Sequence, residues 1–206
     1  MAHKPTIDAY NKIAEEFHSR NSVSIYLKEY EIFESLVGKG SKILEIGCGT
    51  GRDAKELVKL GFDYVGIDAS EGMLKAAKSN VKAGKFEVGD FYKLNFPSDT
   101  FDGFWAAASL LHVPKGEIDK VILEIRRVIK RDGVGFISVK QKSTIDEGII
   151  KESRGGGIER YFSFYVKNEL KDILERNGFS VLNITKMEDD SRDHTIWICY
   201  FVKKIA

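Results

Sequence analysis

Three things that this 206-residue chain lacks narrow what it can be. It has only two cysteines, Cys48 and Cys199, which form neither a CxxC pair nor a disulfide framework, so we expect a reducing, cytoplasmic location. No run reaches the roughly 18 apolar residues of a membrane span, and no apolar stretch follows the first residues as a signal peptide would require. A formal net charge of +1 gives no bulk attraction to nucleic acid or to an anionic membrane.

The chain has enough length and apolar content to fold without cross-links. With 206 residues, of which 43% are hydrophobic, it is predicted to form a single domain over residues 1–206. A chain of this size buries about 70% of the surface that it exposes when unfolded. No linker or internal repeat divides it, and no metal site is predicted.

Strand-like and helix-like segments alternate from residue 43 onward. Short apolar runs predict strands at residues 43–46, 64–67, 86–88, 101–106, 134–139, 179–185 and 195–202. Apolar residues spaced three and four apart predict helices at 52–60, 70–81, 118–129 and 169–176, the second capped by Ser70. Such βα units imply right-handed crossovers and a parallel sheet covered on both faces. The last two strands, joined by a polar turn at 188–191, have no helix between them and are predicted to pair antiparallel.

The predicted fold class is therefore α/β: a doubly wound, seven-stranded, mostly parallel sheet with a reversed strand near one edge. Two segments fall outside the alternation. Residues 5–37 predict two helices, which we expect to form an N-terminal helical lid over residues 1–40, ahead of a core at 41–206. Residues 141–165, which include three consecutive glycines at 155–157, predict a long connection that is functional or mobile.

The segment EIGCGTG at residues 45–51 follows a predicted strand and opens a predicted helix. Its glycines allow positive φ and let a ligand approach the backbone closely, and ligands of open parallel sheets bind beyond the carboxyl ends of the strands. A dinucleotide fold is an alternative, because its fingerprint ends in Gly or Ala. That position is Arg52 when counted from Gly47, which does not fit, but Ala54 when counted from Gly49, which does. The glycines alone therefore do not exclude a dinucleotide fold.

The same segment resembles the E/D-x-G-x-G-x-G first motif of the class I S-adenosylmethionine-dependent methyltransferases. The resemblance continues in order through VGID at 65–68, GDF at 89–91, FDGFW at 101–105, SLLHVP at 109–114 and RRVIK at 126–130. RYF at 160–162 looks like the small-molecule branch, whereas RDG at 131–133 departs from the common Pro-Gly-Gly. The resemblance implies a Rossmann-like fold, S-adenosylmethionine as cofactor and S-adenosylhomocysteine as product.

The resemblance also assigns roles to individual residues. It places the ribose hydroxyls on Asp68 and the adenine beside Asp90 and Phe91, although Asp68 as a helix cap and Asp90 as a turn acid are the alternatives. Glu45 lies inside a strand, where an unpaired carboxylate is costly, so we expect it to bond to backbone amides, water or the amino end of the cofactor. Tyr10 resembles the tyrosine of a Tyr-x-x-x-Ala pattern that lies over the cofactor, with ordinary helix packing as the alternative. The predicted cofactor-binding residues are Tyr10, Glu45, Gly47, Cys48, Gly49, Gly51, Asp68, Ala69, Met73, Asp90, Phe91, Ala106 and Ala107.

Methyl transfer from a sulfonium mainly needs a positioned nucleophile and exclusion of water, and a general base only where the acceptor must lose a proton early. His112, just beyond the fourth strand, is the candidate catalytic residue, although a structural histidine bonded to the backbone of its turn is the favoured interpretation. The predicted substrate pocket comprises His18, in the N-terminal helix that could cover the site, together with Arg160, Tyr161 and Tyr165. For the last three, anchoring of the lid is the alternative.

A nucleic-acid acceptor is disfavoured. Enzymes that methylate exocyclic amines of bases usually carry an Asn/Asp-Pro-Pro-Tyr/Phe segment after strand four, where this chain has AAAS at 106–109. No basic domain is appended to hold phosphates. We therefore predict a small-molecule acceptor, no membrane partner, and a monomer or homodimer. An RNA or protein methyltransferase, or a non-catalytic nucleotide-binding module on the same fold, remains the alternative.

Overall fold

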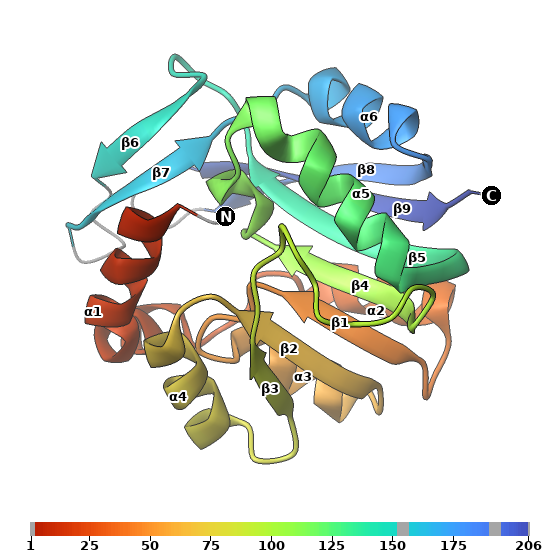
Figure 1. Cartoon of the computed structure of the whole chain (residues 1–206), viewed down its shortest axis with the longest axis horizontal. Helices are drawn as coiled ribbons and strands as arrows, with labels where there is room; N and C mark the ends of the chain where they lie inside the picture. The colour runs from red at the N-terminus through yellow and green to blue at the C-terminus, as the bar shows by residue number, and fades with distance from the viewer. Residues whose placement is uncertain (1–2, 152–156, 190–194, 206) are drawn as a thin grey trace.

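The computed structural model describes residues 3–151, 157–189 and 195–205 and contains a mixed sheet of seven strands (Figure 1). The strand order is β3-β2-β1-β4-β5-β9-β8. The strands are β1 (Lys42–Ile46), β2 (Asp63–Asp68), β3 (Lys85–Val88), β4 (Phe101–Ala107), β5 (Ile129–Lys140), β8 (Phe179–Asp189) and β9 (Thr195–Lys204). Neighbours from β3 to β5 are parallel, whereas β9 runs antiparallel to both β5 and β8. The predicted doubly wound sheet, with one reversed strand next to an edge, is confirmed.

Helices cover both faces of this sheet. They are α1 (Lys4–Asn21), α2 (Leu27–Val37), α3 (Arg52–Lys59), α4 (Glu71–Asn80), α5 (Ile118–Val128) and α6 (Lys167–Arg176), with short 3-10 turns at Leu110–His112 and Lys115–Glu117. In Figure 1, α5 lies in front of β4 and β5, whereas α2 and α3 lie behind the sheet. Ser70 caps α4 as predicted, because its side chain accepts a hydrogen bond from the Met73 amide. None of the described helices is long and apolar enough to cross a membrane.

The core centres on Trp105 of β4, which is fully buried. Its ring stacks on Phe136 of β5 at 3.9 Å between centroids and on Tyr30 of α2 at 4.8 Å. Phe33 of the same helix meets Trp105 edge-on. Aromatic pairs of this kind stabilise a core beyond the area that they bury, so they fix α2 to the face of the sheet.

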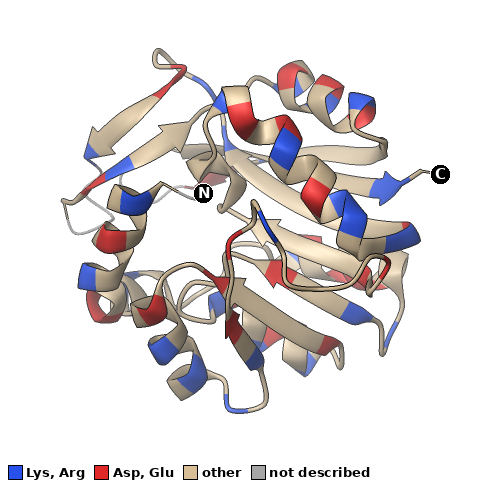
Figure 2. Ribbon diagram, viewed as in Figure 1, with Lys and Arg blue, Asp and Glu red and all other residues tan. Residues whose placement is uncertain are grey.

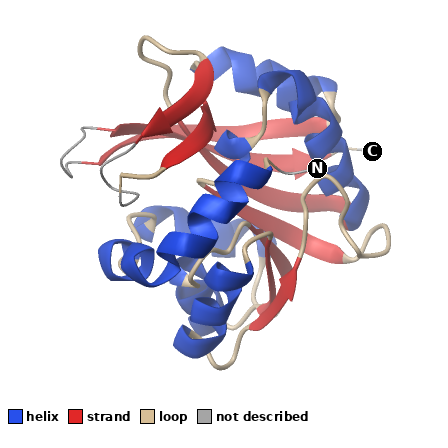
Figure 3. Cartoon of the chain, turned by 60° about the vertical axis from the view of Figure 1, so that its left-hand side comes forward, coloured by secondary structure: helices blue, strands red, loops and turns tan. Residues whose placement is uncertain are grey.

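The expectation that both N-terminal helices form a lid is therefore wrong for α2. Its buried residues, Tyr30 and Phe33 among them, pack into the core, and it contributes no residue to the described lining of either pocket discussed below. Only α1 lies across the carboxyl ends of the strands, beside α4 (Figure 3). The apolar stripes of the two helices look alike in sequence, but they face different partners.

Two further corrections concern strands. Residues 141–165 are not a plain connection, because they contain a two-stranded antiparallel ribbon of β6 (Glu147–Lys151) and β7 (Glu159–Ser163). Gly148 interrupts the β-forming residues of β6, and Ile149 is exposed, so no buried alternation signals the strand. β5 begins at Ile129, earlier than the strand predicted at 134–139, and carries Asp132 and Gly133 inside an irregular stretch of pairing with β4. β8 extends to Asp189, while Asp190 and Ser191 of the predicted turn and Gly155 and Gly156 lie outside the described residues.

Candidate active site

The glycine turn that follows β1 is held tightly against its neighbours. The amides of Gly47 and Cys48 both donate to the Ile67 carbonyl at the end of β2. Gly47 has φ +75°, and a Cβ added there would lie 2.5 Å from the Cβ of Ser109. Gly51 has φ +86°, and a Cβ added there would lie 3.3 Å from the Cα of Ala77 in α4. The backbone of the turn is thus available to a ligand at a position that no larger residue could occupy without strain.

A pocket, here called the main pocket, opens over this turn between the carboxyl ends of β1, β2 and β4 and the underside of α1. It encloses about 980 Å³ when the open space at its mouth is counted. Ten of the predicted cofactor residues line it: Tyr10, Glu45, Gly47, Cys48, Gly49, Asp68, Ala69, Met73, Phe91 and Ala107. A pocket therefore lies at the carboxyl edge of the sheet, where the sequence analysis predicts the site.

Asp68 is the last residue of β2, and its carboxylate accepts hydrogen bonds from the backbone of two neighbouring segments. Its Oδ2 accepts from the Gly49 amide at 2.9 Å, and its Oδ1 accepts from the Ser70 amide at 2.8 Å. Burial raises the pKa of this carboxyl, and the backbone amides offset part of the rise. Asp68 therefore does brace the start of α4, as the helix-cap alternative proposed, while it also faces the pocket.

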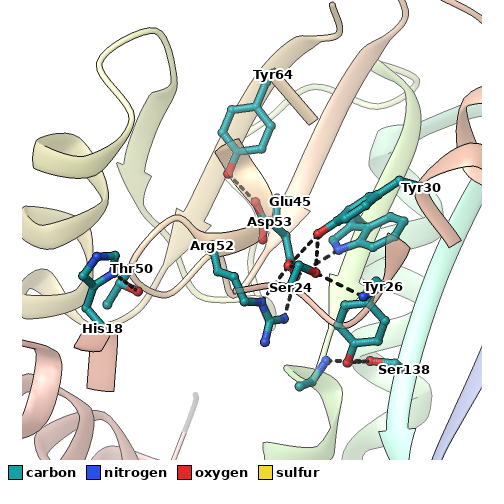
Figure 4. A network of polar contacts seen from close by, with 12 residues as sticks. His18, Ser24, Tyr26, Tyr30, Glu45, Thr50, Arg52, Asp53, Tyr64 and Ser138 are labelled. Atoms are coloured by element: carbon teal, nitrogen blue, oxygen red, sulfur yellow. Dashed lines mark hydrogen bonds and ion pairs between the residues drawn. The ribbon is translucent and has the colours of Figure 1, made fainter. Parts of the chain in front are cut away.

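Glu45 is a buried carboxyl on the same floor. Its Oε2 accepts a hydrogen bond from the Tyr64 hydroxyl, as Figure 4 shows. Its protein partner is therefore a side chain, whereas the sequence analysis named backbone amides, water or the amino end of the cofactor. Burial, reinforced by the negative charge of Asp53, raises its pKa well above the ordinary range. A cationic ligand group placed against this carboxyl would offset that cost.

Arg52 and Asp53 form a buried ion pair that the sequence analysis missed. Arg52 Nε and Nη2 donate to the two carboxylate oxygens at 2.7 and 2.8 Å. Asp53 also accepts from Ser24, from Tyr30 at 2.7 Å and from the Trp105 indole (Figure 4). Burial alone would raise the pKa of Asp53, but the Arg52 charge and these donors hold it below its usual value. The sequence does contain a signal for this buried carboxylate, because Asp53 lies on the helix face that also carries the apolar Ala54 and Leu57.

A chain of hydrogen bonds links α1 to His112. Nδ1 of His112 donates to the Tyr161 carbonyl at 2.6 Å, because a carbonyl can only accept. Burial lowers the pKa of His112 to about 3, so the ring is neutral and its Nε2 accepts from the Tyr10 hydroxyl at 2.8 Å. Arg160 Nη1 in turn donates to the Tyr10 oxygen at 2.8 Å. The bond from His112 to a backbone carbonyl agrees with the structural interpretation, although the carbonyl belongs to β7 and not to its own turn.

A second pocket, here called the side pocket, shares Tyr10, Arg52 and His112 with the main pocket. It continues toward the β6–β7 ribbon and the ends of β5 and β9, where Lys140, Arg160, Phe162 and Trp197 line it. Of the predicted substrate residues, Arg160 is therefore the one that reaches a described pocket lining.

The remaining predicted residues lie elsewhere. Gly51 packs against α4, Ala106 is buried in β4, and Asp90 accepts from the Tyr92 amide in the turn after β3. His18 lies beside Thr50 and Asn80. The Tyr161 hydroxyl donates outward to Glu147, and Tyr165 is buried beneath Lys115. Strand alternation explains Tyr161, because Arg160 and Phe162 occupy the pocket face of β7, and Tyr161 points the other way. Tyr165 lies beyond the end of that strand.

Comparison with known proteins agrees with this geometry. Residues 43–133 match the family model described as a methyltransferase domain. The chain is 28% identical over 221 aligned residues to the ubiquinone biosynthesis O-methyltransferase of Pelagibacter ubique, an alignment that covers 93% of this chain and 90% of that protein. It is 26% identical over 178 residues to the methyltransferase GfsG of Streptomyces halstedii, covering 79% of this chain but 61% of GfsG, so it spans less than two thirds of that relative.

A solved structure shows the same architecture. The Burkholderia thailandensis 1,6-didemethyltoxoflavin-N1-methyltransferase, which holds 1,6-didemethyltoxoflavin and S-adenosylhomocysteine, matches with a TM-score of 0.76 and 15% identity over 97% of this chain and 85% of that one. At this identity the likeness shows the fold. The family model, the sequence relatives and this fold together support a class I S-adenosylmethionine-dependent methyltransferase.

Proposed function

We propose that this chain transfers a methyl group from S-adenosylmethionine, bound in the main pocket, to a small molecule that enters through the side pocket. The observation that carries the proposal is the placement of two carboxylates, the buried Glu45 and the partly buried Asp68, around the glycine turn in one pocket. Ser109, in the same lining, has a buried hydroxyl with no hydrogen-bond partner among the described residues. Buried polar groups of this kind fit a polar cationic cofactor better than an apolar ligand.

The residues present fit each part of that cofactor. Asp68 would accept from the ribose hydroxyls, Glu45 would pair with the ammonium group, and Arg52 would meet the carboxylate. Phe91 would lie beside the adenine, with Asp90 near its exocyclic amine as the family resemblance implies. When bound, the cofactor supplies a methyl carbon, which the lone pair of the acceptor attacks while the C–S bond breaks and sulfur keeps the electron pair.

His112 acts in this proposal mainly as a positioning residue. With a pKa of about 3 it is neutral at physiological pH and a weak base. Its Nε2 holds the Tyr10 hydroxyl at the boundary between the two pockets. Tyr10 and the α1 helix would then close the main pocket from water while the acceptor approaches from the side pocket.

Surface charge supports a small acceptor over a nucleic acid. On the face drawn in Figure 2, basic and acidic residues are interspersed along α1, α4 and α5 and form no continuous basic stripe. Phosphate recognition would need such a stripe. We further propose a cytoplasmic location, supported by two buried cysteines that are not paired with each other, and a monomer or homodimer, which light scattering would distinguish.

Calorimetric titration tests the proposal. We expect S-adenosylmethionine and S-adenosylhomocysteine to bind, and NADH not to bind. Incubation with S-adenosylmethionine and a panel of small nucleophiles should release S-adenosylhomocysteine for at least one acceptor. Binding of NADH without binding of either sulfur nucleoside would refute the proposal in favour of the dinucleotide alternative. Cofactor binding with methylation of RNA or protein alone would refute the acceptor class.

A further inference from the structure

A buried donor in the lining of the side pocket has no acceptor among the described residues. Trp197 is 7% exposed and lines this pocket, and its indole Nε1–H makes no hydrogen bond with any residue that the structure describes. Nε1 is the only polar atom of a tryptophan side chain, and it can only donate. Because a buried donor without an acceptor is costly, an acceptor oxygen on a molecule in the pocket would stabilise this arrangement.

The other tryptophan of the chain provides a contrast. The sequence contains two tryptophans, and Trp105 is fully buried in the core. Its Nε1–H donates to Asp53 Oδ2 at 3.3 Å, so in the core the protein itself supplies the acceptor that a buried indole needs. Trp197 lacks such a partner where its side chain borders a pocket, and a ligand could supply the acceptor there.

The strand pairing places Trp197 beside the main pocket. β9 runs antiparallel to β5, so Trp197, near the start of β9, pairs directly with Lys140, the last residue of β5. The main pocket opens at this same carboxyl edge of the sheet, and Tyr10 and His112 line both pockets. A molecule that accepts from Trp197 would therefore occupy space that adjoins the proposed cofactor site.

Aromatic rings from three elements form walls of the side pocket. Phe17 of α1, Phe162 of β7 and Trp197 of β9 line it, together with the aliphatic Ile25 and Leu111. Aromatic rings favour stacked or edge-on contacts with one another. These walls suit a ligand whose body is a ring.

The basic residues of the lining are engaged by the protein. Lys140 Nζ lies 4.9 Å from the centre of the Phe162 ring and 5.7 Å from that of Trp197. Arg160 donates to the Tyr10 oxygen at 2.8 Å, and Arg52 is paired with Asp53. The unpaired indole donor is neutral, so it calls for an acceptor oxygen on the ligand but for no charge.

We infer that the side pocket binds a ring-bearing molecule that directs a carbonyl oxygen at Trp197 Nε1. The indole proton would be donated to that oxygen, while the rings of Phe17 and Phe162 hold the body of the molecule. This inference rests on the proposed function, since it names the class of molecule that would receive the methyl group. Trp197 is then a specificity-determining residue, and the nucleophilic atom would lie at the other end of the molecule, toward Tyr10 and His112.

The two indole protons give a direct readout by NMR. The probes are matched ring ketones and hydrocarbons: 1-indanone with indane, 1-tetralone with tetralin, and 2-acetylnaphthalene with 2-ethylnaphthalene. Each is titrated into protein that carries isotope-labelled tryptophan and is saturated with S-adenosylhomocysteine. Through-space contacts assign the signals, since Trp105 stacks on Phe136 and Trp197 lies beneath Lys140. We expect at least one ketone to move the Trp197 signal downfield, as a new hydrogen bond does, and further than its hydrocarbon does, while the Trp105 signal stays in place.

Affinities test the same contact independently. Trp197→Phe keeps a ring but removes the donor, so the ratio of ketone affinity to hydrocarbon affinity should fall about fivefold. Phe17→Leu is the matched control, because it reduces a wall of the same pocket and leaves the donor in place. It should weaken both members of a pair and leave their ratio unchanged.

The outcomes separate this inference from the proposed function. The inference is overturned if none of the ketones moves the Trp197 signal further than its hydrocarbon does. It is also overturned if the affinity ratio is unchanged in folded Trp197→Phe, and the wild-type spectrum decides alone if that variant does not fold. Failure of S-adenosylhomocysteine itself to bind would instead refute the proposed function.

Discussion

At the scale of single residues, Asp68 offers the most direct test of cofactor recognition. Replacement by Asn keeps its size but removes the charge that accepts from two backbone amides and, in our proposal, from the ribose. We expect affinity for S-adenosylhomocysteine to fall by about 1–3 kcal/mol, measured calorimetrically. Asp63→Asn, at the exposed opposite end of β2, is the matched control. Unchanged affinity in Asp68→Asn would show that this carboxylate only braces the turn.

His112 predicts a pH dependence of stability. Its pKa is about 3 in the folded protein and about 6.5 when unfolded, so between these two pH values the proton binds mainly to the unfolded chain. Stability is therefore lost as the pH falls. Between pH 7 and pH 5 the wild type should lose about 2 kcal/mol more than His112→Gln, measured by urea unfolding.

Tyr10→Phe separates titration of His112 from loss of its hydrogen bond. This variant removes the hydroxyl that contacts Nε2 but keeps the histidine, so it should retain the slope of the wild type between pH 7 and pH 5. Equal slopes for the wild type and His112→Gln would mean that the imidazole is protonated in the folded protein. The neutral state assigned to His112 would then be incorrect.

At the scale of elements, Asn11 is one of the residues that tie α1 to α4, beside the apolar cluster of Ile13, Ala14 and Met73. Asn11 Oδ1 accepts from the Ser70 hydroxyl at 2.7 Å and from the Gly72 amide at 2.9 Å. Asn11→Ala should loosen α1 from α4 and raise the dissociation rate of S-adenosylhomocysteine about three- to tenfold, as loss of about 1 kcal/mol of hydrogen bonding allows. Stopped-flow displacement measures this rate. Lys12→Ala, exposed on the same helix, should not change it, and an equal rate in both variants would argue against α1 as a lid.

The elements also show how far the sequence could predict this molecule. Strand, turn and helix around residues 45–51 were predictable because glycine spacing and apolar runs are local signals. The partner of α2 was not, since a stripe containing Tyr30 and Phe33 fits either a lid or a sheet, and only the position of Trp105 decides between them. The site was predicted where the family motif covers it, at Glu45 and Asp68. It was missed where tertiary packing selects the residue, as for Lys140 and Trp197.

At the scale of the whole molecule, one buried network joins the core to the main pocket. Asp53 of α3 receives hydrogen bonds from Tyr30 of α2 and Trp105 of β4, while its partner Arg52 lines both pockets. The side chain of Asp53 is 4% exposed, so its charge is balanced inside the protein. Stability and binding should therefore respond together when this carboxylate is changed.

Asp53→Asn tests that coupling. Removal of one partner from a buried ion pair leaves the other uncompensated and costs roughly 3–5 kcal/mol, so we expect a loss of that size in the free energy of unfolding, measured in urea. Affinity for S-adenosylmethionine should fall as well, because Arg52 loses the carboxylate that orients it. Glu56→Gln, on the same helix with an exposed partner in Lys59, should cost less than about 1 kcal/mol. A variant that keeps full stability but loses binding would place Asp53 in direct contact with the cofactor, whereas loss of stability with unchanged binding would separate the core from the site.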